Sequence, residues 1–86
     1  MKKITVFILT HCPHCIGAKN YINELFEENS KYKEIEFEYI DEEEQSELAE
    51  KYDYYYVPTF YVDGEKCHEG VNDKAKIKAV LDYALK

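Results

Sequence analysis

Apolar and polar residues alternate along this chain in patterns that predict strands and helices in turn. The near-continuous apolar run Ile4–Leu9 is typical of a strand covered on both faces. In Ile35–Tyr39 apolar residues alternate with glutamates, which predicts a strand with one solvated face or an edge position. Thr59–Val62 and Glu65–His68 flank an Asp-Gly pair, and this pattern predicts a β-hairpin that ends at Gly70.

Helical spacing of apolar residues occupies the segments between these strands. Pro13 favours a first helical position, so we expect Cys12 to be the N-cap of a helix that continues to about Asn29. The inner face of this helix comprises Tyr21, Ile22, Leu25 and Phe26. Asp41 and Glu44 resemble a capping box that opens a second helix. That helix carries Leu48, Ala49 and Tyr52 inward, and a third amphipathic helix carries Ile77, Val80, Leu81, Ala84 and Leu85.

The order of elements is therefore βαβαββα. A right-handed crossover pairs the first two strands in parallel, and the hairpin adds antiparallel strands. We predict an α/β sandwich, with a four-stranded mixed sheet and helices on both faces, in a single domain of residues 1–86.

Charge and cysteine number narrow the class of protein. The net charge of -7 disfavours nucleic acid and anionic membranes as partners, and no targeting or membrane segment is visible. The cysteine count is three, whereas disulfide-stapled secreted proteins have even numbers. We therefore expect a cytoplasmic protein. We also expect a monomer that holds no bound cofactor.

Cys12 and Cys15 are the strongest chemical signal. At a strand-to-helix junction the first sulfur meets unpaired backbone N–H groups and the helix dipole, which stabilise a thiolate. The pattern favours redox chemistry. The alternative is a metal-binding or carrier module with Cys12, Cys15, Cys67 and His68 as ligands, although Cys67 alone is more typical of a small buried residue in the last strand.

The chain resembles the glutaredoxins of the thioredoxin superfamily over nearly its whole length. The segment from Cys12 to Lys19 is similar to the glutaredoxin Cys-Pro-Tyr-Cys-x-x-Ala-Lys motif. Val57-Pro58 resembles the Val-Pro pair at the start of a strand, and the segment 70–73 resembles the Gly-x-Asp-Asp start of the last helix. Thioredoxins carry a buried aspartate where this chain has Val6, which argues against thioredoxin proper.

The resemblance implies a thioredoxin-like sandwich with a cis peptide bond at Pro58. It also implies that Val57 offers its backbone N–H and C=O to an extended substrate or to glutathione beside Cys12. Lys19, Asn72 and Asp73 are candidate contacts to glutathione, or else an exposed lysine and the N-terminal cap of a helix.

Four features depart from the glutaredoxin pattern, and one of them is Leu9-Thr10 in the stretch where a basic residue commonly precedes the motif. Tyr56 stands where threonine is usual, and Glu69-Gly70 replaces a Gly-Gly pair. The Pro13-His14 dipeptide is that of strongly oxidising periplasmic disulfide oxidases, so we expect His14 to stabilise the Cys12 thiolate. Tyr52, Tyr54, Tyr55 and Tyr56 form either a docking platform or the packing of a loop.

The sequence thus predicts a thiol-disulfide oxidoreductase of the glutaredoxin type. Its expected catalytic residues are Cys12, Pro13, His14, Cys15 and Pro58, and its expected binding residues are Lys19, Tyr56, Val57, Asn72 and Asp73. Cys12 would attack a disulfide of a protein or of glutathione, and Cys15 would resolve the mixed disulfide. The partners would be disulfide-containing proteins, glutathione as co-substrate, and a thiol or flavoprotein reductase.

Overall fold

The computed structural model describes residues 2–86, and its central feature is one mixed sheet with strand order β2-β1-β3-β4. The elements in chain order are β1 (Ile4–Ile8), α1 (Pro13–Glu28), the 3₁₀ helix η1 (Ser30–Glu34), β2 (Phe37–Asp41), α2 (Ser46–Ala49), β3 (Thr59–Val62), β4 (Glu65–Glu69) and α3 (Lys74–Leu85). β1 pairs with β2 in parallel and with β3 antiparallel, and β3 pairs with β4 antiparallel. The predicted order of elements and the mixed sheet are confirmed.

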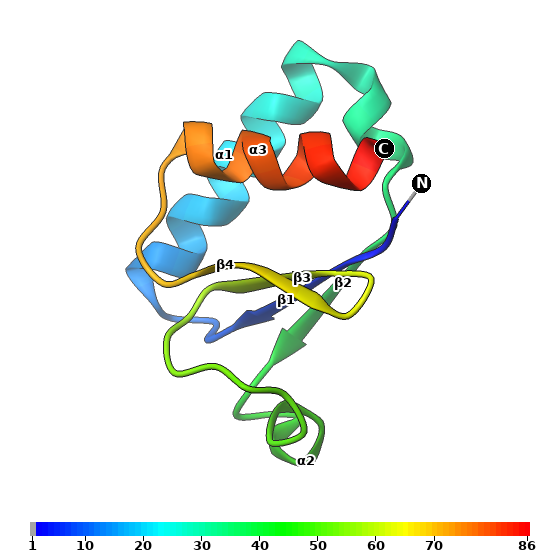
Figure 1. The fold of residues 1–86 in the computed structure, drawn as a ribbon. Helices are drawn as coiled ribbons and strands as arrows, with labels where there is room; N and C mark the ends of the chain where they lie inside the picture. The colour runs from blue at the N-terminus through cyan, green and yellow to red at the C-terminus, as the bar shows by residue number, and fades with distance from the viewer. Residues whose placement is uncertain (1) are drawn as a thin grey trace.

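Helices cover both faces of the sheet, as Figure 1 shows. α1 and α3 lie together on one face, where Ile22, Ile77 and Leu81 pack with Ile4 and Phe60 of the central strands. The short α2 lies on the other face, where a smaller cluster of Phe7, Ile40, Ala49 and Tyr61 is buried. This double coverage accounts for the near-continuous apolar sequence of β1, since both of its faces are in a core.

The β-hairpin predicted at Asp63-Gly64 is present. Asp63 has φ 49° and Gly64 has φ 85°, which are the left-handed angles that a two-residue hairpin loop requires. The Asp63 carboxylate also accepts a hydrogen bond from the N–H of Lys3, 2.9 Å away. An irregularity in the β3/β4 register leaves Cys67 between the paired positions Lys66 and His68.

β2 begins two residues later than the sequence suggested. The chain first turns through η1, which buries Tyr32, and only then enters the strand. Ile35 is buried as expected, but it caps η1 instead of lying in the sheet. The burial of Tyr32 thus favours the 3₁₀ helix over the strand that the alternating pattern predicted at Ile35 and Glu36.

The second helix is also shorter than expected. Asp41 is the last residue of β2, and its carboxylate accepts the N–H groups of Glu43 and Glu44, so the acidic segment forms a turn. α2 proper starts only at Ser46. A side chain that bonds nearby backbone N–H groups favours a turn over a helix, and this explains the difference.

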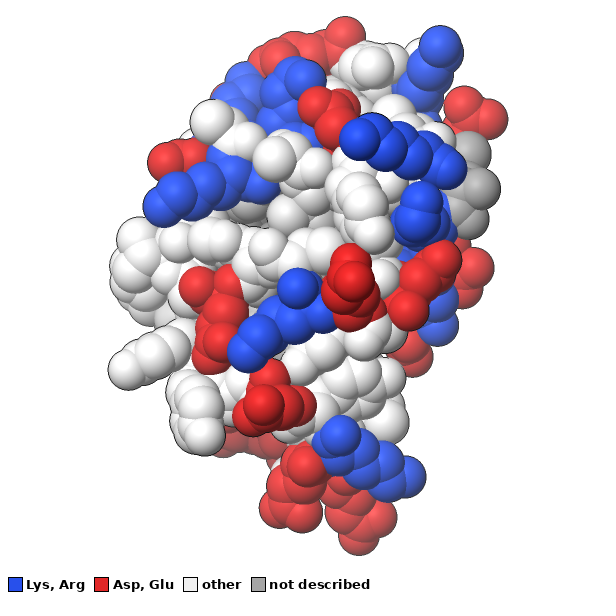
Figure 2. All heavy atoms as spheres, in the orientation of Figure 1, with Lys and Arg blue, Asp and Glu red and all other residues white. Residues whose placement is uncertain are grey.

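Charged side chains are unevenly distributed over the surface. Acidic side chains gather at the end of the molecule that carries α2, the lower end in Figure 2. The side with the β4–α3 connection, on the left in the same view, is mostly uncharged. Over residues 2–86, no helix combines the length and the apolar character needed to span a membrane.

Candidate active site at Cys12 and Cys15

The turn after β1 brings Cys12 to the start of α1. Its N–H donates to the C=O of Leu9 at 3.1 Å, which closes the turn, and its own C=O accepts the N–H groups of Cys15 and Ile16, both at 3.0 Å. Cys12 has extended backbone angles and Pro13 follows at the first helical position. The predicted N-cap is therefore confirmed, and the Cys12 side chain lies at the positive end of the helix.

The two cysteines occupy different environments although only two residues separate them. Both are free thiols, with Cys12 half-buried and Cys15 only 2% exposed. The N–H of Cys15, with that of His14, holds the pKa of Cys12 below its ordinary value, and partial burial opposes this. The pKa of Cys15 is raised to about 11, mainly by burial and in part by the neighbouring Cys12, while the backbone N–H of Leu9 lowers it. Cys12 is thus the more easily ionised thiol.

His14 contributes to the site through its backbone. Its side chain is exposed, as are those of His11 and Pro13. The group of His14 that lowers the pKa of Cys12 is the backbone N–H, which any residue except proline would supply at this position. An effect of the imidazole therefore stays a prediction.

The segment before β3 reaches the same end of the sheet. The Val57–Pro58 peptide bond is cis, as the resemblance implied. Thr59 pairs with Phe7 of β1, so Pro58 lies alongside the end of the strand that leads to Cys12. The C=O of Pro58 accepts the N–H of Gly70 at 2.9 Å.

Val57 keeps its backbone polar groups free. Within residues 2–86, neither its N–H nor its C=O forms a hydrogen bond to another backbone group or to a side chain. The side chain is half-buried against the same core cluster that Cys12 contacts. A free N–H and C=O on an anchored residue can pair with an extended peptide.

The β4–α3 connection completes this end of the molecule. The Asn72 side-chain amide donates to the C=O of His14 at 3.4 Å, which holds the connection against the start of α1. Asp73 is the N-cap of α3 and accepts the N–H of Lys76 at 2.8 Å. Of these two candidate glutathione contacts, Asn72 lies beside the cysteines and Asp73 has a structural role.

Lys19 and the four tyrosines before Val57 differ in whether their side chains contact other residues of the chain or are exposed. The Lys19 ammonium lies 5.0 Å from the centre of the Tyr39 ring on β2. The rings of Tyr52 and Tyr54 pack on Phe7, with ring centres 4.6 and 4.9 Å away. For these two tyrosines, the prediction that they pack the loop is therefore confirmed. Tyr55 and Tyr56 are 85% and 69% exposed, so only these two are available as a platform.

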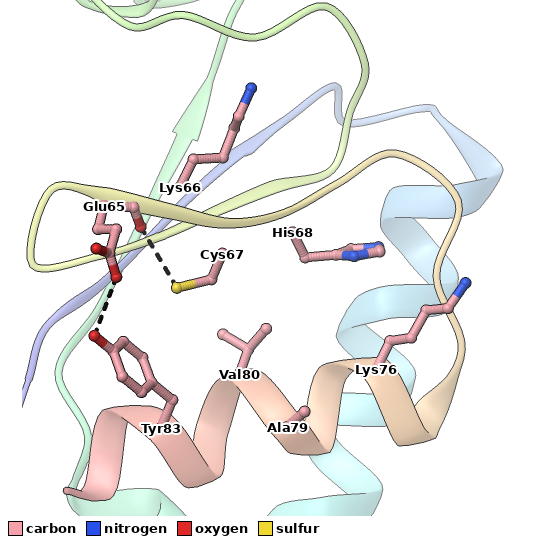
Figure 3. A pocket seen from close by; sticks show the side chains of 8 residues that line it. All are labelled: Glu65, Lys66, Cys67, His68, Lys76, Ala79, Val80 and Tyr83. Carbon is pink, nitrogen blue, oxygen red and sulfur yellow. Dashed lines mark hydrogen bonds between the residues drawn. The ribbon is translucent and has the colours of Figure 1, made fainter.

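Cys67 lies apart from the Cys12 and Cys15 pair. In Figure 3 it points from β4 towards α3, into an open cavity of about 520 Å³ that Val80 and Tyr83 also line. Its sulfur is 3.5 Å from the C=O of Glu65, and burial raises its pKa. Among residues 2–86, no three His, Cys, Asp or Glu side chains come together as a metal site, so the alternative four-residue ligand set is not assembled.

Several contacts at this end were not foreseen from the sequence. The Asp41 carboxylate accepts hydrogen bonds from both the N–H and the hydroxyl of Thr10 and so fixes the turn before Cys12. The Glu69 carboxylate bonds the N–H groups of Tyr55 and Tyr56. The one sequence signal at Glu69 was its place in a pair where glutaredoxins carry two glycines.

Fold and site together define a class, the thiol-disulfide oxidoreductases of the thioredoxin superfamily. The chain belongs to the family described as "Thioredoxin domain", whose family model matches residues 2–82. A curated thioredoxin of Methanocaldococcus jannaschii is 35% identical over 63 residues, which are 73% of this chain and 72% of the relative.

Solved structures support the fold. A thioredoxin of Malassezia sympodialis is 22% identical, with a TM-score of 0.75, and the match covers 99% of this chain and 76% of the other. The oxidised thioredoxin of Plasmodium falciparum gives a TM-score of 0.74 at 22% identity, covering 99% and 82%. These relatives are thioredoxins, and the glutaredoxin subtype stays a prediction.

Proposed function

We propose that this protein reduces disulfides that lie in extended segments of other proteins. The observation that carries the proposal is the free backbone of Val57 at the sheet end where Cys12 stands. A substrate chain that pairs with Val57 would bring its disulfide to the more acidic of the two thiols. The mostly uncharged surface on this side, seen in Figure 2, suits contact with a peptide.

The first step is attack by the Cys12 thiolate on one sulfur of the substrate disulfide. A bond forms between Cys12 and that sulfur, the substrate S–S bond breaks, and the other substrate sulfur leaves as a thiolate that takes up a proton. The N–H groups of Cys15 and His14 favour the attacking thiolate. The N-terminus of α1 adds its dipole.

The second step is attack by Cys15 on the Cys12 sulfur of the mixed disulfide. Burial is the main reason for the raised pKa of Cys15, but the charge and the hydrogen bond of Cys12 also contribute. Both contributions of Cys12 disappear once its sulfur is in a mixed disulfide, so Cys15 then ionises more readily. The products are the Cys12–Cys15 disulfide and the second substrate thiol, and two electrons have passed to the substrate.

A reductant must return two electrons to the Cys12–Cys15 disulfide. We propose a thiol or flavoprotein reductase in a reducing, cytoplasmic setting, with glutathione as a second candidate. Lys19 already contacts Tyr39, and Asp73 caps α3, so two of the expected glutathione contacts have partners inside the chain. This favours a protein disulfide over a glutathione mixed disulfide as the preferred substrate.

The test compares two substrates with the reduced protein. We expect faster reduction of a protein disulfide, such as those of insulin, than of a glutathione-peptide mixed disulfide, and loss of both activities in Cys12→Ser. A matched control is Cys67→Ser, because Cys67 lies outside the site. Preference for the glutathione mixed disulfide would instead support the glutaredoxin subtype, and full activity of Cys12→Ser would contradict the mechanism.

A further inference from the structure

A carboxylate on the last strand holds the segment that precedes Pro58. Glu69 ends β4, and one of its carboxylate oxygens accepts hydrogen bonds from the N–H groups of both Tyr55 and Tyr56, the latter at 2.9 Å. These two residues directly precede Val57 in the chain. A side chain 13 residues further along the sequence than Tyr56 therefore fixes the backbone that leads into the proposed substrate-binding residue.

The other Glu69 carboxylate oxygen is held by a lysine. The Lys66 ammonium lies 2.8 Å from it and also donates to the C=O of Asp53 at 3.2 Å. Lys66, with the N–H groups of Tyr55 and Tyr56, lowers the pKa of Glu69 to about 2. The carboxylate is thus ionised at all physiological pH values, and charge-assisted hydrogen bonds to it are stronger than neutral ones.

One further hydrogen bond and one close approach involve the same segment. The Thr59 hydroxyl donates to the C=O of Tyr56. Gly70, which directly follows β4, has φ 84°, and a Cβ placed there would lie 3.3 Å from the Cβ of Tyr56, so Gly70 closely approaches the Tyr56 side chain. The N–H and C=O of Tyr56 are therefore both occupied, whereas those of the next residue, Val57, are free.

We propose that Glu69 is a positioning residue that orients the free backbone of Val57 towards an extended substrate. This inference rests on the proposed function, because it assumes that Val57 pairs with a substrate chain. Glu69 acts on substrate binding and not on the sulfurs. The pKa of Cys12 is shifted by the backbone N–H groups of Cys15 and His14 and by burial, and Glu69 is not among the groups that shift it.

The experiment separates backbone pairing from sulfur chemistry with two substrates. One is a peptide disulfide with several residues on each side, which can pair with Val57, and the other is a small aromatic disulfide, which cannot. We expect Glu69→Ala to raise the KM for the peptide about five- to tenfold, at a similar kcat, because loss of a charged hydrogen-bond acceptor has effects of this order. The rate with the small disulfide, the thiolate absorbance titration of Cys12 and the reduction potential should stay unchanged.

Two more variants control for folding. Glu69→Gln keeps an oxygen acceptor without the charge, so we expect a KM between those of the parent and of Glu69→Ala. In Glu69→Gln, amide hydrogen exchange at Tyr55 and Tyr56 should be faster than in the parent, which reports on the two hydrogen bonds even if Glu69→Ala does not fold. Glu65→Ala removes a carboxylate from the same strand that accepts a hydrogen bond from the Tyr83 hydroxyl. This variant should leave the KM for the peptide unchanged.

Three outcomes would overturn the inference. These are an unchanged KM in Glu69→Ala, an equal loss with both disulfides, and unchanged amide exchange in Glu69→Gln. Each presupposes an active parent. A parent that reduces neither disulfide would instead refute the proposed function, and the role of Glu69 with it.

Discussion

At the scale of single residues, position relative to α1 distinguishes the two thiols. Cys12 caps the first turn of α1, where the backbone N–H groups of Cys15 and His14 favour its thiolate, and Cys15 is inside the first turn and faces the core. The pKa of Cys12 is therefore lowered by hydrogen bonding and that of Cys15 is raised by burial. In the proposed mechanism, this difference of one helical turn makes Cys12 the attacking thiol and Cys15 the resolving thiol.

Alkylation should reveal this division directly. With limiting iodoacetamide at mildly acidic pH, we expect the reduced protein to be modified first at Cys12, because Cys12 has the lower pKa and the more accessible sulfur. Peptide mass spectrometry after partial reaction identifies the modified cysteine. Faster labelling of Cys15 would reverse the assignment of nucleophile and resolving thiol.

His14 offers a second test at this scale. His14→Tyr keeps the backbone N–H that faces Cys12 and removes only the imidazole. If the imidazole also stabilises the thiolate, the variant has a higher Cys12 pKa and a lower reduction potential. Each pKa unit corresponds to about 1.4 kcal/mol, or about 30 mV for two electrons, because the disulfide contains no thiolate to stabilise.

The measurements for this variant are the thiolate absorbance against pH and the equilibrium with a glutathione buffer. Cys67→Ser is a suitable control, since this substitution lies outside the site. An identical pKa and potential in His14→Tyr and the parent would mean that backbone N–H groups alone set the acidity of Cys12.

At the scale of elements, the connection between β4 and α3 determines the shape of the site. Gly70 carries a positive φ and lies against Tyr56, and Asn72 reaches the start of α1 two residues later. The connection thus joins the segment before β3 to the cysteine helix. The positive φ of Gly70 is a backbone conformation that favours glycine.

Substitution of two glycines by alanine should have opposite effects on stability. Gly70→Ala should lower the free energy of unfolding by about 1–3 kcal/mol, since it forces a left-handed alanine and a close contact with Tyr56. Gly17→Ala should raise it by about 0.5–1 kcal/mol, because Gly17 is inside α1 and a Cβ there meets no atom within 4 Å. Urea unfolding measures both, and equal effects of the two substitutions would contradict the role assigned to Gly70.

At the scale of the whole molecule, carboxylates connect elements that are distant in sequence. The Thr10 hydroxyl lowers the pKa of Asp41, Lys66 lowers that of Glu69, and Lys78 lowers that of Asp82. In these contacts Asp41 joins β2 to the turn before Cys12, and Asp82 joins α3 to the buried Tyr32. The ionised form of each is favoured in the folded protein.

The stability of the fold should therefore decrease in acid. A carboxyl group with a lower pKa in the folded state stabilises the protein above its unfolded pKa, which is about 4 for these residues, and this contribution is lost as the pH falls through the folded value. For Glu69 that value is about 2. We expect the urea midpoint to fall steadily between about pH 5 and pH 2. A constant midpoint over this range would show that these contacts do not contribute to folding.

Local sequence patterns were enough to predict the order of the elements and the position of Cys12 and Cys15 at the start of α1. Strand β1, helix α1 and the hairpin at Asp63 and Gly64 depend on apolar periodicity, on a proline after the cap and on turn chemistry, all of which act over a few residues. The low pKa of Cys12 also follows from a local cause, since the N–H groups involved are those of the next helical turn. Such features could be predicted because nothing distant is needed to form them.

The contacts between distant segments could not be predicted from the sequence and became visible in the folded protein. β2 begins later than predicted because the chain first forms η1, in which Tyr32 is buried. The Asp41 carboxylate accepts a backbone N–H and stabilises a turn where a helix was expected. Glu69 bonds the backbone of Tyr55 and Tyr56, and Asn72 bonds His14 across 58 residues. Contacts of this kind depend on how packed elements align, and the local periodicity of the sequence contains no information about that alignment.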